Sequence, residues 1–177
     1  FIMSGQLSSD GKRFVTFSSD HAVTLWEVET LSKIRVLRPA GSLRAYSISF
    51  SSSGKWILIG SADGAHLFDG YTGEFVHLFG EQNNKVLSAT FSPDERLLAI
   101  AATDRKITLW DVSSRKTLTV LSDVDSIAGQ AGQVLFSPDG KSVLALYQKG
   151  ALIQYDSSSY QQLWSHSFVG VMVNTLA

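Results

Sequence analysis

Apolar and polar residues alternate with a period of two through most of the chain, in short stretches separated by turn-forming residues. Residues 46–50, 56–59 and 107–110 are clear examples, and they are rich in β-branched and aromatic side chains. Gly, Asp, Ser or Pro bounds each stretch, as expected of strands joined by tight turns. The pattern therefore predicts an all-β protein built from short antiparallel strands.

Two landmarks recur along the chain. The first is a turn sequence, found as LSSDGK at 7–12, FSSSGK at 50–55, FSPDER at 91–96 and FSPDGK at 136–141. The second is an aromatic residue followed by an acid, at Trp26, Phe68, Trp110 and Tyr155. Both return every 41 to 45 residues, and within a unit they lie 18 or 19 residues apart. A fixed spacing of this length indicates one supersecondary unit used repeatedly.

The repeat predicts the organisation of the whole chain. We place repeat units at approximately 1–42, 43–84, 85–128 and 129–170, each with four short strands. A small sheet of four strands cannot bury both of its faces, so neighbouring sheets are expected to pack on one another. The Pro and Gly of the first landmark suit a turn that needs a fixed φ and then a positive one.

These repeats resemble those of the WD-repeat β-propellers. The resemblance covers essentially all 177 residues and rests on the combination of SPDG-type turns, a small residue followed by Asp, and the Trp-Asp landmark. It implies four-stranded blades around a central channel, usually about seven of them. Residues 171–177 align with 84–90, so we expect about four blades plus one extra strand, part of a larger ring. A closed ring of four blades is the alternative.

The sequence departs from the family pattern in a buried polar network. The turn Asp is retained as Asp20, Asp63 and Asp104, whereas residues 149–150 replace it in the fourth unit. The family's histidine before the innermost strand appears in no unit, and only Thr16 occupies the hydroxyl position. We therefore expect the network to be broken throughout, and the blades to be held by packing. The four landmark aromatics are expected to lie in the core.

Composition excludes several classes of function. Lys and Arg number 15 against 16 Asp and Glu, with no block of like charges, so neither nucleic acid nor a membrane surface is indicated as a partner. The chain has no cysteine, which removes disulfides, thiolate nucleophiles and Cys-based metal sites. No apolar run approaches 18 residues. These features favour an intracellular location, cytoplasmic or nuclear.

We predict no catalytic residue, metal site or cofactor. The histidines His21, His66, His77 and His166 lack the spacing of zinc ligands and are expected to be exposed or partly packed. The acids recur in turns about one repeat apart, where they form side-chain hydrogen bonds to the backbone rather than paired carboxylates.

The resemblance implies that function is located on the face that carries the connections between blades and the turns between second and third strands. The candidate partner-binding residues on that face are Ser19, Ser42, Arg44, Ala62, Asn83, Lys85, Thr103, Gln130 and Gln148. Arg44 and Lys85 are suited to acidic or phosphorylated groups, and the long connection 122–133 is a further candidate contact.

The predicted function is a non-enzymatic protein–protein interaction scaffold, or a sensor or adaptor region. Its partners would be a protein or peptide, within a multiprotein complex, and the remaining blades of the same protein. Two alternatives stay open: a propeller hydrolase or lyase with its site in the central channel, and blades that only complete a ring. Because sheet faces would be left uncovered, we expect the isolated segment to associate or aggregate.

Overall fold

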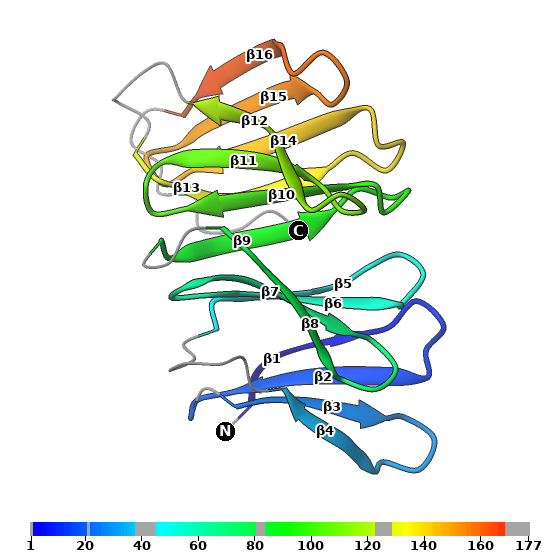
Figure 1. Ribbon diagram of the computed structural model, residues 1–177. Helices are drawn as coiled ribbons and strands as arrows, with labels where there is room; N and C mark the ends of the chain where they lie inside the picture. The colour runs from blue at the N-terminus through cyan, green and yellow to red at the C-terminus, as the bar shows by residue number, and fades with distance from the viewer. Residues whose placement is uncertain (1, 21, 38–44, 81–83, 123–128, 169–177) are drawn as a thin grey trace. The chain divides into compact units, whose positions relative to one another are not determined.

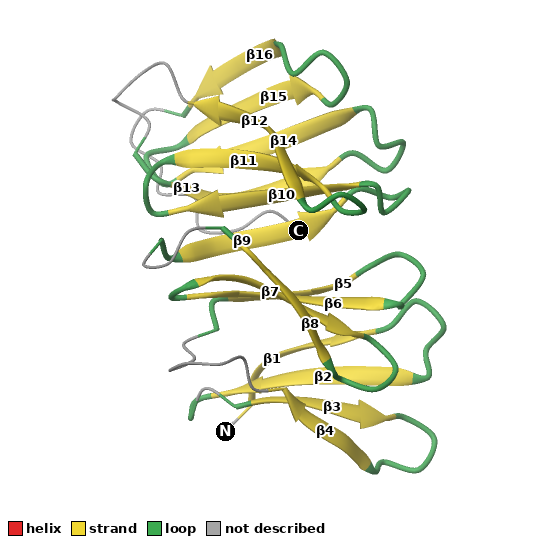
Figure 2. Cartoon of the chain, in the orientation of Figure 1, coloured by secondary structure: helices red, strands yellow, loops and turns green. Residues whose placement is uncertain are grey.

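Sixteen β-strands and no helix make up the part of the chain that the computed structural model describes, residues 2–20, 22–37, 45–80, 84–122 and 129–168 (Figures 1 and 2). The strands form four antiparallel sheets, each of four consecutive strands in sequence order. The predicted all-β architecture of four-stranded antiparallel sheets is therefore confirmed.

Each sheet takes its strands from one stretch of sequence. Sheet 1 contains β1 (Ile2–Leu7), β2 (Arg13–Ser18), β3 (Val23–Glu27) and β4 (Lys33–Leu37). Sheet 2 contains β5 (Ser47–Phe50), β6 (Trp56–Ser61), β7 (Gly64–Asp69) and β8 (Phe75–Phe79). Sheet 3 contains β9 (Val86–Phe91), β10 (Leu97–Ala102), β11 (Lys106–Asp111) and β12 (Lys116–Ser122). Sheet 4 contains β13 (Ala131–Phe136), β14 (Ser142–Tyr147), β15 (Ala151–Asp156) and β16 (Gln162–Ser167).

The landmark aromatic marks the same irregularity in every sheet. Pairing between the third and fourth strands shifts register immediately before Trp26, Phe68, Trp110 and Tyr155. Such a bulge increases the local twist of the two strands. The four sheets therefore share this irregularity as well as their strand order.

The turns explain several of the recurring small residues. In the turn after the first strand, Gly11, Gly54 and Gly140 have φ between 68° and 72°, and Glu95 takes the same conformation in sheet 3 with φ 60°. Glycine adopts this left-handed conformation at the least cost, as the sequence predicted. In the turn between the third and fourth strands the left-handed position holds Leu31, Gly73, Arg115 or Tyr160.

The chain divides into two compact units, Phe1–Val86 and Leu87–Ala177, each with two sheets. In the first unit, sheets 1 and 2 share one buried cluster, made of Val15, Val23, Leu25 and Leu37 from sheet 1, Ile57, Ile59 and Phe68 from sheet 2, and Ala45, which precedes sheet 2. We name the two faces of every sheet by equivalent positions in the repeats. The forward face carries the residues equivalent to Val15 and Leu25 of sheet 1. The backward face carries the residues equivalent to Ile57 and Ile59 of sheet 2.

In the second unit, the forward face of sheet 3 likewise packs on the backward face of sheet 4. The buried cluster contains Ala99, Ala101, Ile107, Leu109 and Leu121 from sheet 3, and Ala131, Val134, Val143, Ala145, Tyr147, Ala151, Ile153 and Tyr155 from sheet 4. The landmark positions thus divide: Phe68 and Tyr155 are buried, whereas Trp26 and Trp110 are only partly buried.

The predicted extra strand, 171–177, lies outside the described residues. None of the residues that are described forms a helix long and apolar enough to cross a membrane.

Candidate partner-binding surface

Three of the predicted binding residues meet at one end of the second unit. Gln130, just before β13, donates from Nε2 to the carbonyl oxygen of Thr103 in the β10–β11 turn at 3.3 Å. The backbone N–H of Gln148, in the β14–β15 turn, donates to the carbonyl oxygen of Gln130 at 3.0 Å. Gln130 therefore links turns from both sheets, and the exposed side chain of Gln148 borders this point.

At the corresponding end of the first unit, a lysine lies over an aromatic ring. Lys85 Nζ lies 4.0 Å from the ring centre of Tyr46, which precedes β5 and is 36% exposed. A lysine at this distance is attracted to the face of the ring. Lys85 was predicted as a candidate contact, whereas Tyr46 was missed. The cation thus lies against an aromatic ring at the surface.

The turn aspartates are occupied with local hydrogen bonds. Beside the exposed Ser19, Asp20 accepts hydrogen bonds from the Ser18 hydroxyl and from the backbone of Ala22, and the hydroxyl lowers its pKa. Asp104 accepts from the backbone N–H of Lys106 at 3.1 Å. These carboxylates therefore shape their turns through local hydrogen bonds.

The turn in sheet 2 corrects one expectation. His66 was expected to be exposed or partly packed, but it is 1% exposed, and its Nε2 lies 2.9 Å from Oδ1 of Asp63, next to the partly buried Ala62. Burial raises the pKa of Asp63, but hydrogen bonds from Ser61 and His66 outweigh this and lower it. A histidine inside β7 thus meets the turn Asp that the family's histidine before the innermost strand would have met.

Sheet 1 corrects the expectation that the polar network is broken throughout. The indole Nε1–H of Trp26 donates to the hydroxyl of Thr16 at 2.9 Å, and Thr16 is buried. The one unit that kept the hydroxyl therefore kept its bond to the landmark tryptophan.

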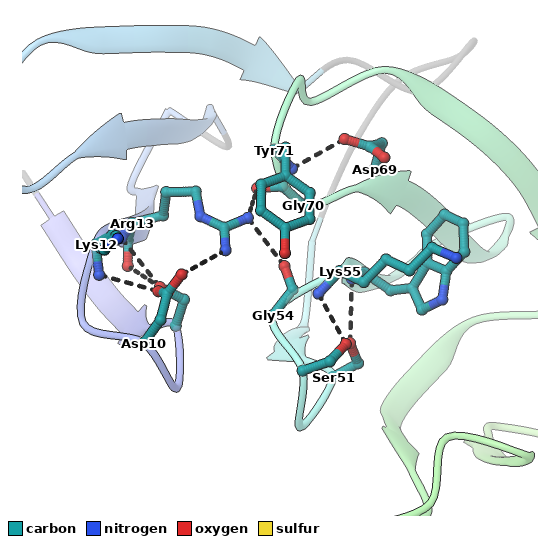
Figure 3. Close-up of polar contacts among 12 residues, drawn as sticks. Asp10, Lys12, Arg13, Ser51, Gly54, Lys55, Asp69, Gly70 and Tyr71 are labelled. Atoms are coloured by element: carbon teal, nitrogen blue, oxygen red, sulfur yellow. Dashed lines mark hydrogen bonds and ion pairs between the residues drawn. The ribbon is translucent and has the colours of Figure 1, made fainter.

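A second polar cluster, at the opposite end of the first unit, was missed by the sequence analysis (Figure 3). Arg13, at the start of β2, donates from Nη1 to the carbonyl oxygens of Gly54 at 3.0 Å and Gly70 at 2.7 Å, both in turns of sheet 2. Its Nη2 lies 3.0 Å from Asp10, and the guanidinium lies 3.8 Å from the ring centre of Tyr71. Arg13 thus fastens sheet 1 to sheet 2.

One signal could have found this cluster. When the four landmark turns are aligned, the position of Arg13 holds Trp56, Leu97 and Ser142 in the other units. A charged residue at one of four equivalent strand starts indicates a local partner, because a buried charge needs one. The two carbonyl acceptors themselves could not be read from the sequence, since they depend on how the turns of sheet 2 approach sheet 1.

Three predicted binding residues, Ser42, Arg44 and Asn83, lie outside the described residues, as do His21 and much of the connection 122–133. Within the described ranges, no three His, Asp or Glu side chains come together as a metal ion would require.

Comparison with known proteins agrees with this architecture. Residues 32–65 and 73–111 match the family described as WD domain, G-beta repeat. The meiotic recombination protein rec14 of Schizosaccharomyces pombe is 31% identical over 109 residues, covering 61% of this chain and 36% of that protein. Transcription initiation factor TFIID subunit 5 of Caenorhabditis elegans is 24% identical over 155 residues, which cover 86% of this chain and 23% of that protein. The WD repeat-containing protein WDS homolog of Arabidopsis thaliana is 28% identical over 154 residues, which cover 80% of this chain and 28% of that protein.

Repeated four-stranded antiparallel sheets, packed forward face on backward face within each unit, are blades of a β-propeller. With these matches, residues 32–65 and 73–111 are identified as WD repeats, and the chain is similar to WD-repeat proteins over most of its length. It spans between about a quarter and a third of the length of these three relatives. WD-repeat proteins generally act as scaffolds or adaptors for protein interactions.

Proposed function

We propose that this chain is a non-enzymatic interaction scaffold that binds a protein or peptide through the ends of its blades, at an intracellular site, cytoplasmic or nuclear. The observation that carries the proposal is the cation of Lys85, which lies over the exposed ring of Tyr46. A positioned ammonium beside an aromatic ring suits an acidic or phosphorylated side chain that brings apolar stem to the ring. The remaining blades of the same protein would complete the propeller.

The second unit supports a polar component of the same function. Thr103, Gln130 and Gln148 join turns of two sheets at a surface where amide groups can donate and accept. Because the turns stand on rigid sheets, their spacing is fixed before a partner arrives, which reduces the ordering cost of binding. Ser19 and Ala62 lie in the corresponding turns of the first unit and complete the set of described candidates.

The test uses two matched lysines. Lys55 Nζ lies 4.7 Å from the ring of Trp56, so it also pairs with an aromatic ring, but it lies in the turn between β5 and β6, away from the proposed surface. Lys85→Glu and Lys55→Glu change the net charge equally and each removes one cation–π contact. Fluorescence anisotropy with labelled peptides rich in Glu and Asp, each with phosphoserine and Gln/Asn versions, reports affinity for each variant.

We expect the acidic or phosphoserine peptides to bind, and Lys85→Glu to weaken binding about tenfold, corresponding to about 1.4 kcal/mol. Lys55→Glu should bind as the unaltered chain does. Equal losses in both variants would assign the effect to net charge, and would refute the proposed surface. Binding to no peptide would favour blades with a purely structural role.

A further inference from the structure

We propose that the β10–β11 and β14–β15 turns, at one end of the second unit, bind a phosphorylated serine or threonine of a protein partner. The cations that would hold the phosphate group are Arg105 and Lys149. This inference rests on the proposed function, in which the ends of the blades bind a protein or peptide. It adds a second site, in the second unit, and names the chemical group that the site recognises.

The turns that join the second and third strands differ in charge between the two units. In sheets 1 and 2 the described residues of these turns include Asp20 and Asp63 but no lysine or arginine. In sheet 3 the turn contains Arg105 directly after Asp104, and in sheet 4 Lys149 lies in the turn that has lost its Asp. These turns are therefore acidic in the first unit and carry cations in the second.

The cations at this end have no acidic partner in the part of the chain that the structure describes. Arg105, Lys149 and Lys106, which begins β11, are exposed, and none of them forms an ion pair with a described residue. Asp104 accepts a hydrogen bond from the backbone N–H of Lys106 at 3.1 Å. Three cations against this one carboxylate leave an excess of two positive charges. A phosphate monoester carries between about −1.5 and −2 charges at neutral pH and matches this excess, whereas a carboxylate supplies only one.

Contacts within the second unit hold the two turns beside one another. The side chain of Gln130 donates to the carbonyl oxygen of Thr103 in one turn, and its own carbonyl oxygen accepts from the backbone N–H of Gln148 in the other. A Cβ added to Gly129, the residue before Gln130, would lie 3.2 Å from Cγ of Lys149. The stem of Lys149 therefore lies beside the segment that connects the two turns.

The residue types of the two turns suit a phosphate group. A guanidinium can donate two parallel N–H bonds to phosphate oxygens, and an ammonium adds further donors. The hydroxyl of Thr103 and the exposed amide of Gln148 belong to the same turns and can donate to a remaining oxygen. Arg105 has a φ of 67°, and its backbone N–H donates to the carbonyl oxygen of Ala102 at 3.2 Å. The backbone from which the arginine side chain extends is therefore hydrogen-bonded within its turn.

Amide chemical shifts of the full chain, measured by NMR, test this site directly. The probe is a phosphoserine residue with both ends capped, and capped glutamate is its carboxylate counterpart. The phosphoserine probe should shift the amides of residues 103–106 and 148–150, and should bind there about fivefold more tightly than the glutamate probe. Equal affinities would overturn the assignment to phosphate, and unchanged amides in these turns would overturn the site.

Two matched pairs of variants separate the site from the net charge of the chain. Arg105→Asn and Lys149→Gln each remove one cation of the site, and asparagine tolerates the φ of 67° at position 105. The controls are Arg115→Asn and Lys141→Gln, because both residues are exposed in turns at the other end of sheets 3 and 4, and Arg115 has a φ of 59°. Each site variant should bind the phosphoserine probe about tenfold more weakly, and each control as the original chain does. Equal losses in the controls would refute the site.

The same titrations distinguish a failure of this site from a failure of the proposed function. Lys85→Glu, which tests the surface of the first unit, should leave the shifts of residues 103–106 and 148–150 unchanged. If those shifts occur while Lys85→Glu has no effect on peptide binding, the site in the second unit stands and the surface at Lys85 is refuted. If peptide binding depends on Lys85 and the amides of the second unit do not respond, the proposed function stands and this site is refuted.

Discussion

The sheet interface within the first unit and the one within the second are fastened differently, although both come from the same repeat. Between sheets 3 and 4 the described buried cluster contains 13 side chains, all apolar or aromatic. Between sheets 1 and 2 the cluster contains eight, and Arg13 adds hydrogen bonds to two carbonyl oxygens of sheet 2. Leu97 occupies the position of Arg13 in sheet 3. A smaller apolar contact is thus accompanied by a polar one.

The difference shows what one blade geometry tolerates. Burying a guanidinium is costly unless its donors are satisfied, and the turns of sheet 2 place two carbonyl oxygens where Arg13 needs them. Asp10 balances the charge and Tyr71 covers the guanidinium. Apolar area and a hydrogen-bonded, ion-paired cation are therefore alternative ways to hold neighbouring blades together.

The largest expected effect comes from breaking the apolar interface. Leu109 is fully buried between sheets 3 and 4, so Leu109→Ala should lower the free energy of unfolding by about 3.5 kcal/mol through lost contacts and a residual cavity. Leu118→Ala, at an exposed position of the same sheet, is the control and should change little. Urea unfolding measures both, and equal losses would contradict the assignment of Leu109 to the interface.

Breaking the polar interface should have a smaller effect. Arg13→Met keeps the apolar stem but leaves the carbonyls of Gly54 and Gly70 without their donor, for an expected loss of about 2.5 kcal/mol. Amide hydrogen exchange should accelerate in the turns of sheet 2 that contain these glycines. Arg96→Met, at an exposed arginine in the first turn of sheet 3, serves as control. Unchanged exchange in those turns would show that Arg13 does not fasten the two sheets.

The smallest expected effect is a change in how the stability of the fold depends on acidic pH. Hydrogen bonds from the backbone of Ser114, and then from the hydroxyls of Ser114 and Ser113, lower the pKa of Asp111 from 3.8 to about 2. A lowered pKa stabilises the fold above about pH 4, and this contribution is lost as the pH falls towards 2. Asp111→Asn should therefore show a shallower loss of stability over that range, measured by urea unfolding at each pH. An identical pH profile would rule out this contribution.

Asp10 gives the corresponding test in the first unit. The hydroxyl of Ser8, the backbone of Lys12 and the side chain of Arg13 lower its pKa. In the Arg13→Met variant one of these three causes is absent. The acid sensitivity of the first unit should then begin at a higher pH than in the original chain, while the amides around Asp111 should keep their original pH dependence.

The fold was predictable because periodic features of the sequence determine it. Alternation with a period of two gave strands, and the recurring landmarks gave the number of sheets and the place of each bulge-bearing aromatic, such as Trp26 and Trp110. The burial of these two tryptophans was overestimated. Burial depends on the surroundings of a side chain, which a repeat pattern does not specify.

The candidate surface was predictable only in part. Lys85, Thr103, Gln130 and Gln148 were placed by repeat position, and the structure brings the last three together. His66 was misjudged, because its contact with Asp63 depends on the path of one hairpin and no equivalent residue in the other units is a histidine. Single occurrences of this kind have no pattern from which they can be inferred.

The turn at Gly73 determines where the chain can be modified. A Cβ added there would lie 2.7 Å from Leu37, in the neighbouring sheet, and φ is 69°, so this turn has room only for glycine. The equivalent positions Leu31 and Arg115 are exposed and already carry side chains. Fluorophores or displayed loops could therefore be attached at those two turns, whereas the same alteration at Gly73 would collide with Leu37.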